Sequence, residues 1–210
     1  RNPDKAELLG QRQLDFLENW AADWQGCDMK AGLSQTVFAQ CHTHAGGNQN
    51  VSQHTPDSNG WPPHARNKAL RHIRKAFAVM IAGDNHLPTV VHHGIESWED
   101  AGVSFTVPSI AAGFPRAWWP EKAGLKRRDG SPPYLSGFSD TPDYLGRYMS
   151  GWDHPITFLA AANPKKWGGH RPGDIQLLDN KSSGFGLVRF NRENRNITFE
   201  CWRILGNPET

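Results

Sequence analysis

The stretch Phe77-Ala-Val-Met-Ile-Ala-Gly-Asp-Asn-His86 indicates how the middle of this chain folds. The run from Phe77 to Ala82 is short, continuous and apolar, which is typical of a strand covered on both faces. Gly83 ends this run and permits a tight turn. The sequence therefore predicts a buried strand that leads directly into the polar residues Asp84, Asn85 and His86.

A helix is predicted just before this strand, from about His64 to Lys75. Its apolar residues Leu70 and Ile73 recur at helical spacing, together with Phe77. We interpret the basic residues of the other face as solvated, and they are Arg66, Lys68, Arg71, Arg74 and Lys75. A helix that feeds a buried strand forms an αβ unit.

The remaining elements predict a mixed fold, α/β with α+β features, in one domain. We expect a helix over 6–24, a short strand over 32–39, and a C-terminal hairpin of strands 184–190 and 197–202. We divide residues 1–210 into a core over 6–110, an irregular region rich in Trp, Pro and Gly over 111–180, and the hairpin region over 181–206.

Asp84 and His86 are candidate metal ligands. In open α/β sheets, ligands gather beyond the carboxyl ends of the strands, which is where the predicted strand leaves these residues. A carboxylate and a neutral imidazole this close in sequence suit Zn, Fe or Mn. The alternative is an Asp that caps a turn beside a packed His.

Other histidines are candidates for the same pocket. His42 and His44 alternate directly after the strand predicted over 32–39, and the alternative is that they are ordinary polar loop residues. His92 and His93 are adjacent in an extended segment, so they point to opposite sides and at most one meets the pocket.

Composition excludes several classes of protein. A formal charge of +2 over 210 residues does not imply a nucleic-acid partner. The apolar runs are far shorter than the roughly 20 residues that span a bilayer, so we expect no membrane span. Three cysteines without CxxC spacing favour neither a zinc knuckle nor a disulfide scaffold.

The chain opens with Arg1 and shows no signal peptide, so we expect residues upstream of it.

Several segments together resemble the PhoD-like alkaline phosphatases of the metallophosphoesterase (calcineurin-like) superfamily. The resemblance covers 6–110 and is poor over 115–180. Its landmarks are Leu9-Gly-Gln-Arg-Gln-Leu-Asp-Phe-Leu17, Ser34-Gln-Thr-Val-Phe38, Asp57-Ser-Asn-Gly-Trp-Pro62 and Val79-Met-Ile-Ala-Gly-Asp-Asn-His86.

The resemblance implies a fold and a site. The fold would be the C-terminal half of a metallophosphoesterase-type β-sandwich flanked by helices and closed by the hairpin. Asp84 and His86 would hold divalent or trivalent ions, either Fe, Ca, Zn or Mn. The remaining ligands would come from an N-terminal half of the same polypeptide, without which the enzyme would be inactive.

The resemblance also implies hydrolysis of a phosphate mono- or diester by metal-activated water. A histidine near the metals would protonate the leaving alkoxide or stabilise phosphoryl charge, and the candidates are His42, His44, His92 and His93. Asn59 and Trp61 would bind substrate. The protein would be secreted or periplasmic.

Two rival interpretations stay open. One is a non-catalytic carbohydrate-binding or cell-surface module, in which Trp118, Trp119, Trp152 and Trp167 form stacking platforms; packing of these rings beneath long loops is the plain alternative. The other is a metallohydrolase that acts on a different ester, such as a nuclease.

Overall fold

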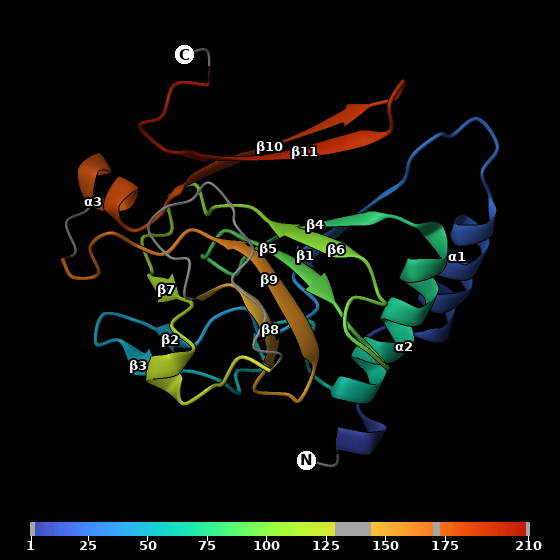
Figure 1. Cartoon of the computed structure of the whole chain (residues 1–210), viewed down its shortest axis with the longest axis horizontal. Helices are drawn as coiled ribbons and strands as arrows, with labels where there is room; N and C mark the ends of the chain where they lie inside the picture. Colours follow the sequence, from blue (N-terminus) through green and yellow to red (C-terminus); the bar gives the residue numbers. More distant parts are fainter. Residues whose placement is uncertain (1–2, 129–143, 170–172, 209–210) are drawn as a thin grey trace.

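The computed structural model describes residues 3–128, 144–169 and 173–208. The fold is mixed α+β, with a six-stranded sheet of order β1-β4-β6-β5-β9-β8 and two smaller sheets (Figure 1). The helical elements are η1 (Pro3–Lys5), α1 (Gln11–Ala22), α2 (Pro63–Ile73), η2 (Arg74–Ala76), η3 (Glu121–Ala123) and α3 (Ile175–Asn180). The strands are β1 (Ala31–Thr36), β2 (His44–Ala45), β3 (Asn50–Val51), β4 (Val79–Gly83), β5 (Thr89–His93), β6 (Val103–Thr106), β7 (Arg116–Ala117), β8 (Gly146–Met149), β9 (Pro155–Ala161), β10 (Gly184–Asn191) and β11 (Asn196–Arg203).

The predicted buried strand is β4, and it lies inside the large sheet. It pairs parallel with β1 on one side and with β6 on the other, so the carboxyl ends of these strands share one edge. The strand begins later than the sequence predicted. Phe77 is 86% exposed and adopts a left-handed conformation (φ 49°) that ends η2. The aromatic residue therefore belongs to the turn that precedes the strand.

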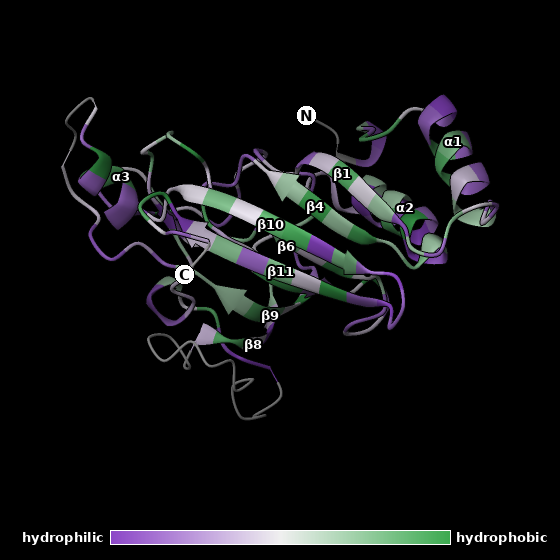
Figure 2. Cartoon of the chain, turned by 90° about the horizontal axis from the view of Figure 1, so that it is seen from above, coloured by the Kyte–Doolittle hydropathy of each residue, from purple (hydrophilic) through white to green (hydrophobic). Residues whose placement is uncertain are grey.

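Helices and a hairpin cover opposite faces of the large sheet (Figure 2). Met80 packs with Leu70 and Ile73 of α2. The side chain of Phe105 points to the opposite face of the sheet from Met80. On that face its ring lies 5.1 Å from that of Phe199 in β11. Strand β10 approaches so closely that a Cβ at Gly186 would lie 2.8 Å from Phe105. The hairpin is thus packed against the sheet.

The region 111–180 is less irregular than we predicted. Strand β9 pairs antiparallel with β5, and β8 pairs antiparallel with β9, so the two complete the large sheet. Apolar side chains hold them in place, as Phe158 of β9 stacks on Trp118 with ring centroids 3.8 Å apart. Within this region, residues 129–143 and 170–172 lie outside the described part of the chain.

One basic residue of α2 contradicts the interpretation of a solvated helix face. Arg66 is fully buried, and its guanidinium donates to the carbonyl oxygens of Phe38 (2.8 Å) and Gly94 (2.6 Å). Lys68, Arg71 and Lys75 are exposed as expected. Arg66 therefore ties α2 to the loops around it. Among the described helices, no helix is long and apolar enough to cross a membrane.

Candidate functional site

The turn after β4 presents Asp84 and His86 on either side of Asn85. Both flanking residues have left-handed backbone conformations, with φ of 59° and 53°, although neither is glycine. Asp84 is exposed and His86 is half-buried, whereas Asn85 is fully buried. Such conformations are uncommon outside glycine and cluster at functional sites. The turn directs a carboxylate and an imidazole outward from the carboxyl end of an interior strand.

Asn85 anchors this turn from inside. Its Oδ1 accepts a hydrogen bond from Nδ1 of His42 at 3.0 Å. Its backbone N–H donates to the Gly83 carbonyl oxygen at 2.7 Å. The guanidinium of Arg116 lies 3.5 Å from both the side-chain and the main-chain oxygen of Asn85. The buried amide therefore joins the turn to two segments that are distant in sequence.

His42 is a neutral, buried member of the site. Burial is the main cause that lowers its pKa to about 3, and the charge of Arg116 lowers it further. With Nδ1–H donating to Asn85, the Nε2 atom accepts from the Gln40 amide at 2.9 Å. Both ring nitrogens are thus engaged within the protein. His42 is arranged to position Asn85 and, through it, the turn.

His86 is arranged as a metal-ligating histidine would be. Its Nδ1 lies 3.2 Å from the carbonyl oxygen of Phe114, so Nδ1 carries the proton and donates it there. The lone pair is then on Nε2, and an outer hydrogen bond of this kind commonly fixes the ring of a metal ligand. The ring of Phe114 packs edge-on to that of His86 at 5.9 Å.

The donor set fits a metal ion in part. Asp84 and His86 supply an oxygen and a nitrogen ligand of the types that Zn, Fe and Mn accept. Within residues 3–128, 144–169 and 173–208, no group of three or more His, Cys, Asp or Glu residues is placed to hold a metal. These two residues therefore provide only part of a coordination shell.

Sequence reasoning missed Arg116 and Asp57. Arg116 is 8% exposed, and its Nη2 donates to the carboxylate of Asp57 in the loop that follows β3. Arg116 was visible in the sequence only as part of a tryptophan-rich segment. Its place next to Asn85 depends on the pairing of β7 with β2, which no local pattern indicates.

The other candidate histidines do not join this site in the same way. The ring of His44 faces Trp119 at 5.3 Å and hydrogen-bonds to Thr43. His92 pairs with Val103 at the amino end of β6, whereas Asp84 follows the carboxyl end of the parallel strand β4. The sheet therefore places His92 and His93 at the opposite end from Asp84. The prediction that one of these two histidines shares a pocket with Asp84 is not met by this arrangement.

His93 belongs to a separate buried network. Its Nε2 lies 2.6 Å from the Ser104 hydroxyl and its Nδ1 lies 3.3 Å from the Arg66 guanidinium. Burial, first, and the charge of Arg66 hold the pKa of His93 well below its usual value. His92 is half-buried, and burial also lowers its pKa. Neither imidazole is close to the turn after β4 in the strand register.

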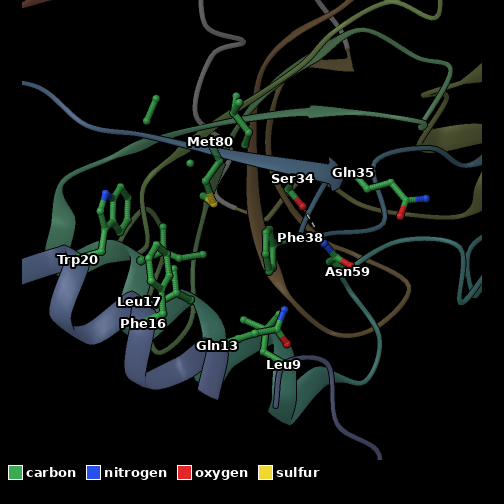
Figure 3. Close-up of a pocket in the computed structure, with 14 residues that line it drawn as sticks. Leu9, Gln13, Phe16, Leu17, Trp20, Ser34, Gln35, Phe38, Asn59 and Met80 are labelled. Atoms are coloured by element: carbon green, nitrogen blue, oxygen red, sulfur yellow. Dashed lines mark hydrogen bonds between the residues drawn. The ribbon is translucent and has the colours of Figure 1, made fainter. Parts of the chain in front are cut away.

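Asn59 lies at the end of an apolar groove between α1 and β1 (Figure 3). Its side-chain amide donates to the Ser34 hydroxyl at 3.0 Å and to the Thr36 carbonyl oxygen at 3.2 Å. Because Thr36 pairs with Gly83, Asn59 is at the same edge of the sheet as Asp84, one strand further out. Trp61 follows in the same loop and is half-buried.

The tryptophans are mostly packing residues. Trp118 and Trp167 are buried, and the ring of Trp119 contacts Trp167 at 5.0 Å. Lys122 covers the Trp119 ring at 4.3 Å. This packing removes most of the open ring faces that a carbohydrate platform would need.

Comparisons with known proteins give one likeness. No protein-family model matches this sequence, and no curated protein matches it. Among solved structures, the chain is similar to one described as "Structure of PhoD", with 14% sequence identity and a TM-score of 0.42. The match covers 98% of this chain and 38% of that one, so the chain spans well under half the length of that protein.

Proposed function

We propose that this chain carries part of the active site of a metal-dependent phosphoesterase, a PhoD-like alkaline phosphatase or phosphodiesterase. The observation that carries the proposal is the turn after β4. Asp84 and His86 extend from it in left-handed conformations, and the Phe114 carbonyl oxygen holds the His86 ring with Nε2 as the acceptor nitrogen. An arginine suited to phosphoryl oxygens lies against the same turn.

Each residue has a defined task in this proposal. Asp84 and His86 would hold the metal ions, and Asn85 would keep the two ligands at a fixed separation. His42 would keep Asn85 in place as a neutral hydrogen-bond donor, since burial and Arg116 lower its pKa to about 3. When bound, the metal ions activate water near neutral pH and neutralise charge on the phosphoryl group.

The proposed active site also requires residues from the rest of the protein. The remaining ligands would come from an N-terminal half of the same polypeptide, and the two halves together would form a metallophosphoesterase-type β-sandwich. Catalysis would therefore need both. The sequence resemblance is also the basis for proposing a secreted or periplasmic location.

The test is metal analysis beside hydrolysis of a generic phosphate ester by the intact protein. Asp84→Asn removes an anionic ligand and His86→Ala removes an imidazole. Because the loss of an outer partner alone commonly costs about 10- to 100-fold in metal affinity or activity, each change should lower metal content and turnover together by at least about tenfold.

Asp15→Asn and His64→Ala on the exposed surfaces of α1 and α2 are matched controls and should retain both properties. Unchanged metal content in both site variants would remove the metal assignment. A panel of carboxylic and phosphoric esters separates this function from that of a metallohydrolase acting on a different ester.

A further inference from the structure

The guanidinium of Arg116 is incompletely satisfied. Its one close ionic partner among the described residues is the carboxylate of Asp57. Its contacts with the two Asn85 oxygens are 3.5 Å long, which is near the limit for a hydrogen bond. Its Nε is buried and has no hydrogen-bond partner in the described part of the chain. The Arg116 guanidinium is therefore held mainly by Asp57 and has no second close anionic partner among the described residues.

The two partners of this ion pair differ in their need for it. The Arg116 side chain is 9% exposed, whereas that of Asp57 is 53% exposed. A buried cation requires a nearby anion, because an unpaired buried charge is strongly destabilising. The exposed carboxylate can be solvated by water instead. Asp57 can thus leave, provided that another oxyanion takes its place on Arg116.

The position of Arg116 relates it to the proposed metal ligands. It contacts Asn85, which separates Asp84 from His86 in sequence. The Phe114 ring lies 5.9 Å from the guanidinium carbon and also 5.9 Å from the His86 ring. An oxyanion bound to Arg116 would therefore lie beside the turn that presents Asp84 and His86. Guanidinium donors also match the paired oxygens of a phosphoryl group.

We propose that Arg116 binds the phosphoryl oxygens of the substrate, and that Asp57 occupies this position as an exchangeable counter-ion when substrate is absent. This inference rests on the proposed phosphoesterase function and adds a residue to it. It also assigns the loop around Asp57 a role in substrate entry, because the carboxylate must move away from Arg116 before phosphate can bind there.

The experiment measures inorganic phosphate binding to the intact, metal-loaded protein by calorimetry, together with KM and kcat for a phosphate ester. Arg116→Met removes every donor and should weaken phosphate binding by about 10- to 100-fold, the value expected for hydrogen bonds to a charged group. Arg116→Lys keeps the charge without the paired donors and should fall between. Metal content should fall far less than phosphate affinity in both, because the contacts of Arg116 with Asn85 are long, at 3.5 Å.

Asp57→Asn distinguishes an exchangeable counter-ion from a structural support. Removing the competing charge should tighten phosphate binding by about two- to fivefold and lower KM, since a pair exposed on one side contributes up to about 1 kcal/mol. Weaker phosphate binding in Asp57→Asn would overturn the exchange, because Asp57 would then be holding Arg116 in place.

The ion pair between Arg203 and Asp179 supplies matched controls. Arg203→Met and Asp179→Asn should leave the phosphate affinity unchanged. If the wild-type protein hydrolyses esters but the Arg116 variants keep their KM and phosphate affinity, this inference fails and the proposed function stands. If the metal-loaded wild type neither binds phosphate nor hydrolyses an ester, the proposed function fails as well.

Discussion

The Nδ1 atom of His42 lies 3.0 Å from Oδ1 of Asn85, across 43 residues of sequence. This contact joins the loop after β1 to the turn after β4. It also fixes the tautomer of His42, because burial keeps the imidazole neutral and its one proton must be on Nδ1 to be donated to the Asn85 oxygen. This hydrogen bond therefore helps to position Asp84 and His86, the candidate metal ligands, although neither of them takes part in it.

His42→Phe should destabilise the fold and loosen the turn. It removes the donor that lies 3.0 Å from the Asn85 oxygen, whereas the Gln40 amide keeps the Ser52 carbonyl oxygen at 3.0 Å, and an unpaired buried polar group costs about 1 to 3 kcal/mol. The free energy of unfolding, measured in urea, should fall by that amount, and metal affinity should fall with it. His64→Phe on the exposed face of α2 is the control. Equal effects of the two changes would mean that the His42 to Asn85 bond has no role in stability.

His154 should make the protein less stable in mild acid. It is 2% exposed, and both ring nitrogens lack partners among the described residues. Burial, first, and the charge of Arg66 lower its pKa to about 3. The pKa of His154 in the folded protein lies below its unfolded value near 6.5. The contribution of neutral His154 to the free energy of unfolding is therefore fully present above about pH 6.5. It is lost progressively as the pH falls toward the folded value.

The measurement is the free energy of unfolding between pH 7 and pH 5 for the wild type and His154→Phe. A single proton taken up on unfolding gives a slope of up to about 1.4 kcal/mol per pH unit. As the pH falls, the free energy of unfolding of the variant should decrease less steeply than that of the wild type, and the two slopes should differ by up to about this amount. Parallel curves would show that His154 keeps an ordinary pKa in the folded protein.

Arg66→Met should be among the most destabilising changes on α2. The guanidinium donates to the carbonyl oxygens of Phe38 and Gly94, and methionine leaves both buried acceptors unpaired. Two such losses correspond to about 2 to 5 kcal/mol. Lys68→Met is the control on the same helix, because this side chain is exposed and should change stability by less than about 0.5 kcal/mol. A small effect at Arg66 would contradict its structural role.

The elements with strong local patterns were predictable. The apolar run before Gly83 and the helical spacing of Leu70 and Ile73 reflect burial against the core, and both elements are present. Arg66 could not be separated from Lys68 by composition, because burial of one basic residue depends on which loops pack against the helix. Strand β9 was missed because its pairing partner, β5, is distant in sequence.

Only part of the candidate site was predictable from the sequence. Asp84 and His86 follow a strand whose pattern is visible, so their position at its carboxyl end could be derived. His42 was expected in the pocket of Asp84 only as one of several candidate histidines, and its hydrogen bond to Asn85 was not predicted. Arg116 and Asp57 meet across 59 residues, and only the folded chain brings them together.

Asp84→Gly should separate stability from function. Asp84 has φ of 59°, a conformation in which glycine avoids the clash of a Cβ, at a cost of roughly 1 kcal/mol for other residues. Glycine also adds freedom to the unfolded chain, which offsets part of that gain. The free energy of unfolding should therefore stay the same or rise by up to about 1 kcal/mol, while metal content and ester hydrolysis are lost with the carboxylate. Gln49→Gly is the matched control, since Gln49 has φ of 55° in an exposed turn and should show the same change in stability with full activity. If Asp84→Gly instead destabilises the protein by several kcal/mol in the absence of metal, the carboxylate supports the fold, and its left-handed conformation is not retained for ligand binding.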